Sequence, residues 1–388
     1  MPYISDRIVH DADSHVMEIP NWLDEFGSKR VVDAFHKRFG KRSKNWAQEL
    51  QAQHQSKEFR DKNEDEVMAR KNHDALGAFR KEDRSLAVNH IGLSSQLVFP
   101  TSTNVWLETL EHGDDIDLLY ETASATNRSQ VDFCGNDPRL LPVGYVSLAD
   151  IPRASVAAKE AIALGVKALL VPWACPKDHA TSHIELDPVW QQAAEAEIPV
   201  LLHVGLADRV LPAAHKINGL PDVPDFHGGE ENFRSISYMA IPHGPMQALS
   251  MLILDGVLDR HETLKIGVIE LGAAWLPGFM RQLDAGFEAF ARHEERLQSL
   301  KLKPSEYVTR QIRVTPYPTE PTGWIISHSH QDICMFSSDY PHLEGGRNPY
   351  GRFSRSLEGM SDQIKDKFFQ HNFEDLMGKR TMSGVFAN

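Results

Sequence analysis

Cysteine is rare in this chain, and long hydrophobic runs are missing from it. Its 388 residues include three cysteines, an odd number without C-x-x-C spacing: Cys134, Cys175 and Cys334. This excludes a disulfide framework and a thiolate metal site. No run approaches the roughly 18 apolar residues of a membrane-spanning helix, and the first residues lack the basic and apolar segments of a secretory signal. We therefore expect a cytoplasmic protein without a membrane partner.

Positive charge is also in short supply. The chain has 41 lysines and arginines against 54 aspartates and glutamates, a net charge of −13. This balance opposes binding to a phosphate backbone and excludes nucleic acid as the expected partner. With 41% hydrophobic and 24% charged residues, the composition is that of a globular protein. A small molecule is the expected substrate.

The glycine-rich phosphate-binding pattern of dinucleotide folds is absent as well. Asp11-Ala12-Asp13-Ser14 stands where that pattern needs glycines, which argues against a doubly wound sheet. Eight short apolar runs recur instead, several without the polar alternation of half-exposed strands. They span residues 8–9, 96–99, 141–146, 166–171, 199–202, 264–269, 312–314 and 333–336. With helix-like segments between them, they predict an α/β fold, a (β/α)8 TIM barrel, which gathers functional residues at the carboxyl ends of its strands.

Two connections are too long for ordinary barrel loops. Residues 21–93 are polar and charge-dense, so we expect a largely helical insertion after the first strand that covers the barrel mouth. Residues 206–238 contain three prolines and the pair Gly228-Gly229, which favours a long active-site loop after the fifth strand over a helix. No linker divides the chain, so residues 1–388 are expected to form a single domain.

Polar side chains stand at the ends of several predicted strands. These carboxyl and imidazole groups are Asp13, His15, Glu18, His203, Glu270 and Asp339. Imidazole and carboxylate ligands from separate strands are the usual composition of a catalytic zinc, manganese or iron site. Taken singly, each has an ordinary explanation, because Asp13 can cap a helix and a histidine after a strand is often a hydrogen-bonded loop residue.

Four segments carry a resemblance to a known family. They are Asp13-Ser14-His15, His203-Val204-Gly205, residues 264–277 and Ser338-Asp339-Tyr340-Pro341-His342. In this order they resemble the amidohydrolase-related family (amidohydrolase 2), in the branch of aminocarboxymuconate semialdehyde decarboxylase and the hydroxybenzoate decarboxylases. The likeness spans nearly the whole chain, and residues 372–378 resemble the family's closing helix. Residues 21–93 match no motif of the family.

The resemblance implies a metal-dependent enzyme that binds one divalent ion, zinc, manganese or iron. The ligands that it implies are Asp13, His15, His203 and Asp339, of which Asp13 departs from the usual His-x-His or Glu-x-His motif but still offers an oxygen. The implied reaction is metal-assisted hydrolysis or non-oxidative decarboxylation of a small organic acid or amide, with a carboxylate as the expected substrate. A homodimer or larger oligomer is the family-level expectation.

Glu270 leaves the chemistry open, because the decarboxylases of the family carry a histidine at the matching position. Glu270 can act as a base, orient His203 or His15, or bind a second ion together with His243 and Glu18. Two ions of iron or manganese support oxygen chemistry, so a dinuclear hydroxylase on the same barrel is the alternative function. A catalytically silent subunit of a larger complex is a further alternative.

Other polar and aromatic residues are weaker candidates. His342 can donate a hydrogen bond to a substrate oxygen, and it is the third candidate catalytic residue beside Glu270 and His243. Arg234 and Arg347 can pair with a substrate carboxylate. Trp173 and Trp275 are expected to be core aromatics rather than stacking surfaces.

Overall fold

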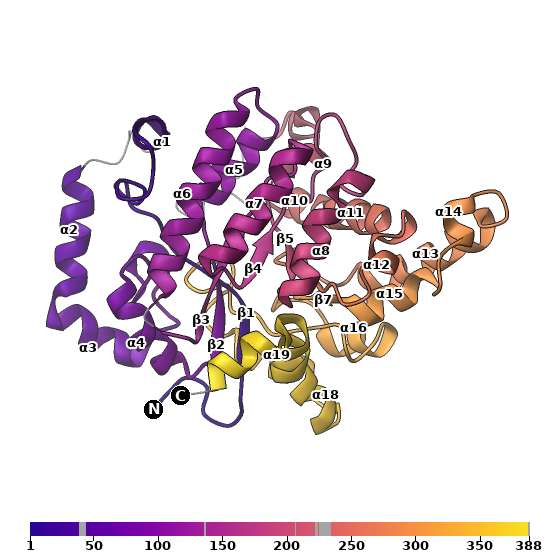
Figure 1. Cartoon of the computed structure of the whole chain (residues 1–388). Helices are drawn as coiled ribbons and strands as arrows, with labels where there is room; N and C mark the ends of the chain where they lie inside the picture. The colour runs from indigo at the N-terminus through magenta and orange to yellow at the C-terminus, as the bar shows by residue number, and fades with distance from the viewer. Residues whose placement is uncertain (39–43, 136, 206, 222–223, 225–233, 387–388) are drawn as a thin grey trace.

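A computed structural model describes residues 1–386 except 39–43, 136, 206, 222–223 and 225–233 (Figure 1). Within these residues, seven parallel strands follow one another in chain order around one curled sheet. They are β1 (His10–His15), β2 (Ser95–Phe99), β3 (Leu140–Tyr145), β4 (Ala168–Leu170), β5 (Val200–His203), β6 (Ile266–Ile269) and β7 (Ile312–Val314). All their residues are buried, as expected when helices cover the outside of a sheet and side chains fill its inside.

The eighth predicted strand closes the barrel without forming a regular strand. The backbone N–H of Val314 in β7 donates to the carbonyl of Ile333 at 2.9 Å, and that of Ala12 in β1 donates to the carbonyl of Phe336 at 3.1 Å. Residues 333–336 therefore lie between β7 and β1 and are hydrogen-bonded to both. The predicted TIM barrel is confirmed, with an extended segment in its last position.

Helices follow the strands on the outside of the sheet (Figure 1). They are α5 (Ser102–Glu111) and α6 (Ile116–Cys134) after β2, α7 (Ile151–Leu164) after β3, α8 (Asp187–Ala196) after β4, α11 (His243–Leu254) and α12 (Val257–Arg260) after β5, α13 (Leu276–Phe290), α14 (Glu295–Gln298) and α15 (Pro304–Gln311) after β6, and α16 (Thr322–His328), α17 (Pro349–Ser356), α18 (Asp362–Asp366) and α19 (Asn372–Phe386) after β7. Local sequence sets these bounds. At α7, for example, the Asp150 side chain accepts the N–H of Arg153, and Gly165 ends the helix with a φ of 108°.

The first strand lies later in the chain than its apolar residues predict. The pattern places it at residues 8–9, whereas β1 runs from His10 to His15 and contains Asp13 and His15 rather than preceding them. Hydrogen bonds allow its polar side chains to be buried, as when Ser14 Oγ donates to the carbonyl of Leu97 at 2.6 Å. A strand this polar escapes a search for apolar runs.

Residues 21–93 contain α1 (Lys29–Arg38), α2 (Lys44–Gln55), α3 (Lys57–Glu66), η1 (Asn72–Asp74) and α4 (Lys81–Ile91). The fully buried Arg84 of α4 ties this insertion to the barrel, because its guanidinium donates to the carbonyl of His15 at 3.0 Å and to Ser14 Oγ at 2.8 Å. The Tyr340 hydroxyl donates to the carbonyl of Leu76 at 2.7 Å. The insertion is thus fixed to β1 and to the last barrel segment, and its role as a cover of the mouth stays a prediction.

The connection after β5 differs from the predicted loop. The short helices α9 (Ala207–Val210), η3 (Ala213–Lys216) and α10 (Ser235–Ala240) lie within it or at its end. Pro212 directly precedes η3 with a φ of −52°, and proline is compatible with a helix start because no intrahelical N–H is needed there. The pair Gly228-Gly229 lies outside the described residues.

Helix α19 closes the amino-terminal end of the barrel, close to β1 and β7 (yellow in Figure 1). Its Phe373 and Leu376 join an interior hydrophobic cluster that includes Leu201 of β5. Lys265, just before β6, forms an ion pair with Asp375 at 2.8 Å. The opposite end, where the strands deliver their last residues, is left for a functional site.

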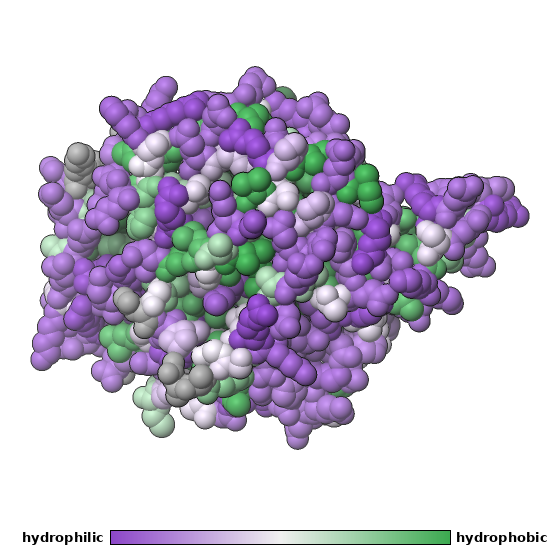
Figure 2. Space-filling model, viewed as in Figure 1, coloured by the Kyte–Doolittle hydropathy of each residue, from purple (hydrophilic) through white to green (hydrophobic). Residues whose placement is uncertain are grey.

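The molecular surface agrees with a globular composition. The face in Figure 2 is mainly hydrophilic, with hydrophobic patches near its centre. Among the residues that the structure describes, no helix combines the length and the apolar character that crossing a membrane requires.

Candidate metal centre

Asp13 and His15 come from alternate positions of β1 and share its inner face, because side chains repeat every second residue in a strand. Backbone hydrogen bonds attach this part of β1 to the last barrel segment. The N–H of Asp339 donates to the carbonyl of Asp13 at 2.9 Å, and the N–H of His15 donates to the carbonyl of Tyr340 at 2.7 Å. The strand therefore brings Asp339 beside the first two candidate ligands.

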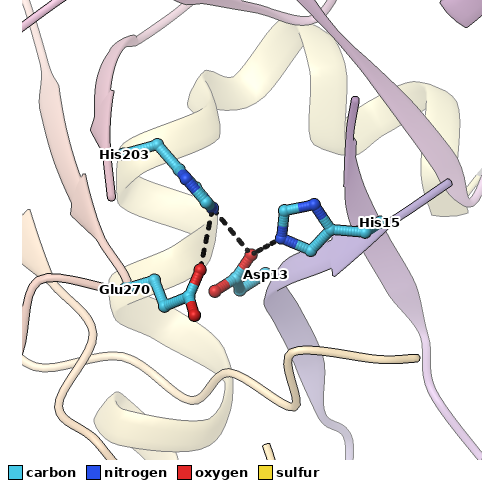
Figure 3. Close-up of side chains that lie close together, drawn as sticks. All are labelled: Asp13, His15, His203 and Glu270. Atoms are coloured by element: carbon cyan, nitrogen blue, oxygen red, sulfur yellow. Dashed lines mark ion pairs between the residues drawn. The ribbon is translucent and has the colours of Figure 1, made fainter. Parts of the chain in front are cut away.

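Two side chains from other strands converge on Asp13 (Figure 3). His203, the last residue of β5, places Nε2 3.4 Å from Oδ1 of Asp13 and 3.4 Å from Oε2 of Glu270, which directly follows β6. His15 Nε2 lies 3.1 Å from the same Asp13 oxygen. These four residues are buried, and their ligand atoms all lie within 4.8 Å of one another.

A second group overlaps the first. It consists of His15, Glu270, Asp339 and His342, again with ligand atoms within 4.8 Å. Nδ1 of His342 lies 3.0 Å from Oδ1 of Asp339, and the rings of His15 and His342 stack with centroids 4.1 Å apart. His15 and Glu270 belong to both groups, so the site is one continuous pocket of imidazoles and carboxylates.

Two of the carboxylates stand on strained backbone. Glu270 and Asp339 have φ values of 54° and 52°, in the left-handed region that residues with a Cβ rarely adopt. The Tyr317 hydroxyl donates to the carbonyl of Glu270 at 2.7 Å, and the Glu270 N–H donates to Thr315 Oγ1 at 2.9 Å. These hydrogen bonds hold the Glu270 side chain at the centre against the local preference of the chain.

Several buried polar atoms at the centre make no hydrogen bond in the described part of the chain, although some of them lie close to one another as ion pairs. Both side-chain oxygens of Asp13 and of Asp339, and Nε2 of His15 and of His203, are shielded from solvent and make no hydrogen bond within the described residues. Burying such atoms costs free energy unless something compensates them. A divalent cation fits this donor set of two imidazole nitrogens and carboxylate oxygens.

The protonation states also suit metal binding. Burial raises the pKa of Asp13, but His15 and His203 outweigh this and lower the pKa overall. Burial and the neighbouring His342 lower the pKa of His15. The site therefore favours an ionised Asp13 and a neutral His15, which are the forms that coordinate a cation.

Two predicted ligands lie outside both groups. Glu18 instead binds the start of α5, where Oε2 accepts the N–H of Ser102 at 2.8 Å and Oε1 accepts the hydroxyl of Thr103 at 2.6 Å. His243 begins α11, and its Nδ1 lies 3.0 Å from the carbonyl oxygen of Ala240. Neither belongs to the ligand groups formed by the described residues.

The weaker candidates occupy varied positions. Arg234 directly precedes α10 and is partly buried, whereas Arg347 is exposed. Trp173 is buried in the main hydrophobic cluster, and Trp275 is half-buried, with Nε1 donating to the carbonyl of Gly272 at 2.8 Å. Both tryptophans pack against the core, as their sequence context predicts.

Sequence reasoning missed Thr101, which contacts two of the histidines. Its Oγ1 lies 3.1 Å from Nε2 of His342 and 3.3 Å from Nδ1 of His15. A hydrogen bond to the second ring nitrogen fixes which nitrogen of His15 faces the centre. Thr101 stands two residues after β2, so reading every strand end, and not only those with charged residues, would have found it.

Family comparison agrees with this architecture. A family model described as amidohydrolase matches residues 12–378. The chain therefore belongs to the amidohydrolase family, which confirms the resemblance and identifies it as an enzyme of that class. No curated protein matches the chain in sequence.

Solved structures with the same fold include enzymes that hold manganese. An amidohydrolase from Mycobacterium avium subsp. paratuberculosis K-10 is 20% identical, with a TM-score of 0.73 and coverage of 97% of this chain and 100% of that chain. A 5-carboxyvanillate decarboxylase from Novosphingobium aromaticivorans, complexed with manganese and 4-hydroxy-3-methoxy-5-nitrobenzoic acid, is 20% identical (TM-score 0.62; 95% and 96% covered). A dihydroxybenzoic acid decarboxylase from Polaromonas sp. JS666, with manganese and 2-nitroresorcinol, is 14% identical (TM-score 0.64; 97% and 99% covered).

Proposed function

We propose that this chain is a metal-dependent enzyme that removes carbon dioxide from a small organic acid. One divalent ion would be held by Asp13, His15, His203 and Asp339. The observation that carries the proposal is that buried side-chain atoms of all four residues lack hydrogen bonds within the described chain. Asp13, His15 and His203 belong to one ligand group, and Asp339 belongs to the group that overlaps it at His15. The two decarboxylases that share the fold and hold manganese support the choice of reaction and of metal. Such an ion, when bound, polarises the oxygens of a substrate.

We propose that a side chain of the protein donates the proton that replaces carbon dioxide on the substrate. Loss of carbon dioxide leaves a carbon that must gain a proton, so an acid is needed beside the ligands. Glu270, buried beside His203 at 3.4 Å, is our assignment for this role. His342, held by Thr101, is assigned to orient a substrate oxygen. Metal-assisted hydrolysis of an amide would use the same Glu270 as its base.

The test is release of carbon dioxide by the manganese-loaded protein from dihydroxybenzoic acids and 5-carboxyvanillate. We expect turnover by the natural chain and a loss of at least about 100-fold in His203→Ala, because the metal ligand is gone. His328→Ala, which removes an exposed histidine of α16, is the matched control and should retain full activity. Turnover that survives in His203→Ala, or cleavage of amides without carbon dioxide release, would contradict the proposed reaction.

A second candidate function is oxygen-dependent hydroxylation at a dinuclear iron or manganese centre. The specific observation in its favour is the second ligand group, in which Asp339 and His342 share His15 and Glu270 with the first. Carboxylate-rich sites of this kind suit two adjacent ions. Two ions per chain together with oxygen consumption would favour this function over decarboxylation.

A further inference from the structure

Lys71, contributed by the insertion, has an ammonium group that is shielded from solvent and influenced by the charge of Asp339. It precedes η1, and the next residue, Asn72, donates its backbone N–H to the carbonyl of Pro341 at 2.8 Å. Pro341 lies between Asp339 and His342 in the chain. The backbone of the insertion at Lys71 is therefore held against the segment that carries two site residues.

The side chain of Lys71 has the reverse of the usual lysine arrangement. Lysines normally bury their methylene groups and keep the ammonium in water. Here the residue is partly exposed, yet Nζ is shielded from solvent and makes no hydrogen bond with the described residues. A charged group that is buried without a partner costs free energy, so its retention points to a ligand that completes it.

The charges around Lys71 indicate which ligand. Burial lowers its pKa to about 8, and this is partly offset by the negative charges of Asp339, Glu344 and Asp11. The hydrogen-bonding capacity of Nζ is unused by the described residues. An anion that reaches from the metal ligands toward Asp339 would meet Nζ.

We propose that Lys71 binds an anionic group of the substrate, namely a carboxylate, on the Asp339 side of the metal centre. This inference rests on the proposed function, which supplies the metal-bound small acid. The inference adds that the substrate carries a carboxylate that is separate from the oxygens expected to contact the metal. Lys71 thus selects dianionic or diacid substrates over otherwise similar phenols.

Two nitrophenols, of which only one carries a carboxylate, provide the test when their binding is compared between the natural chain and its Lys71 variants. 4-Hydroxy-3-methoxy-5-nitrobenzoic acid and 2-nitroresorcinol both place a hydroxyl beside a nitro group, but only the first has a carboxylate. Binding of each to the manganese-loaded protein is measured by calorimetry. We expect the natural chain to bind the acid more tightly by about tenfold or more, the effect of a charge-assisted hydrogen bond.

The variant Lys71→Met should abolish this preference and leave the affinity for 2-nitroresorcinol unchanged. Lys71→Gln, which removes the same charge but keeps a polar group, should give the same result. Lys62→Met removes the same charge from an exposed position of α3 and should keep the preference. The midpoint of thermal unfolding should stay the same or rise in Lys71→Met, because an unpartnered buried charge is removed.

Each other outcome has a definite meaning. If both Lys71 variants keep the preference for the acid, the anion site is wrong and the proposed function is untouched. If Lys71→Met markedly lowers the unfolding midpoint, Lys71 has a structural role and the anion site is again wrong. If neither compound binds the manganese-loaded natural chain, the proposed function fails, and the anion site fails with it.

Discussion

Asp11 connects the two segments that supply the carboxylates of the centre. Its Oδ1 accepts the N–H of Ser338 at 2.8 Å, and its Oδ2 accepts the Ser338 hydroxyl at 2.6 Å and the Gln96 amide at 2.9 Å. Ser338 directly precedes Asp339, and Asp11 lies two residues before Asp13. Burial raises the pKa of Asp11 to about 7 despite these hydrogen bonds. A single buried side chain thus sets the spacing of both ligands.

Replacing Asp11 by alanine should therefore destabilise the fold. We expect Asp11→Ala to lower the free energy of unfolding by about 2–4 kcal/mol, because the buried donors of Ser338 and Gln96 lose their acceptor. Urea denaturation measures this loss. Asp114→Ala, at an exposed residue whose partner is Lys177, is the control and should cost less than about 1 kcal/mol. Equal losses in the two variants would refute the connecting role of Asp11.

Individual site residues differ in how well the sequence predicts their positions. His203 and Glu270 follow buried, largely apolar strands, so the pattern predicts both strand ends. The direction of His203 follows from the alternation of the strand. The direction of Glu270 does not, because its φ of 54° departs from the strand conformation. Glu18 lies beyond a strand end, where alternation no longer fixes direction, and it turns toward the amino terminus of α5. Lys71 was not predicted, because its segment has no periodicity that relates it to the barrel.

At the scale of elements, the insertion contains a buried histidine that makes its stability depend on pH. The ring of His54 in α2 packs between Phe59 and Phe79, with centroid distances of 4.0 and 4.6 Å. Burial lowers the pKa of His54 to about 4. The unfolded chain takes up a proton near pH 6.5, whereas the folded chain does so only near pH 4. Stability is therefore lost as the pH falls from 6.5 to 4.

The variant His54→Phe should remove this dependence. Between pH 7 and pH 4 we expect the natural chain to lose up to about 3 kcal/mol more unfolding free energy than the variant. Denaturation curves at several pH values give the difference, and all other titrating groups cancel in the comparison. His328→Phe, at an exposed histidine, should behave like the natural chain. Parallel pH profiles for the natural chain and His54→Phe would contradict the burial of a neutral ring.

The elements themselves were predictable where the chain is uniformly apolar. The second to seventh strands fall within or next to their predicted runs, because burial on both faces favours apolar residues at most positions. Gln96 in β2 and Arg313 in β7 are buried exceptions. β1 lies later than predicted because hydrogen bonds, not apolar side chains, allow its burial. The connection after β5 contains short helices whose starts tolerate the prolines that suggested a loop.

At the scale of the whole molecule, the barrel brings together residues that are far apart in the sequence. Asp13 and His342, the first and last members of the two ligand groups, are separated by more than 300 positions. Closure by residues 333–336 brings Asp339 and His342 beside β1, where Oδ1 of Asp339 lies 3.7 Å from Nε2 of His15, and α19 closes the opposite end of the barrel. The insertion adds Arg84, which fixes β1, and Lys71. The order of strands in a TIM barrel predicts this assembly, whereas no comparable rule predicts the contacts of the insertion with the barrel.

Metal content tests the central claim most directly. Protein dialysed after loading with manganese should retain about one ion per chain by elemental analysis, because we propose that Asp13, His15, His203 and Asp339 hold it through buried atoms that lack hydrogen bonds within the described chain. The double variant Asp13→Ala, His203→Ala should retain less than about a tenth of that amount, while His328→Ala should match the natural chain. Failure of the natural chain to retain metal, or equal retention by the double variant, would contradict a metal centre at these residues.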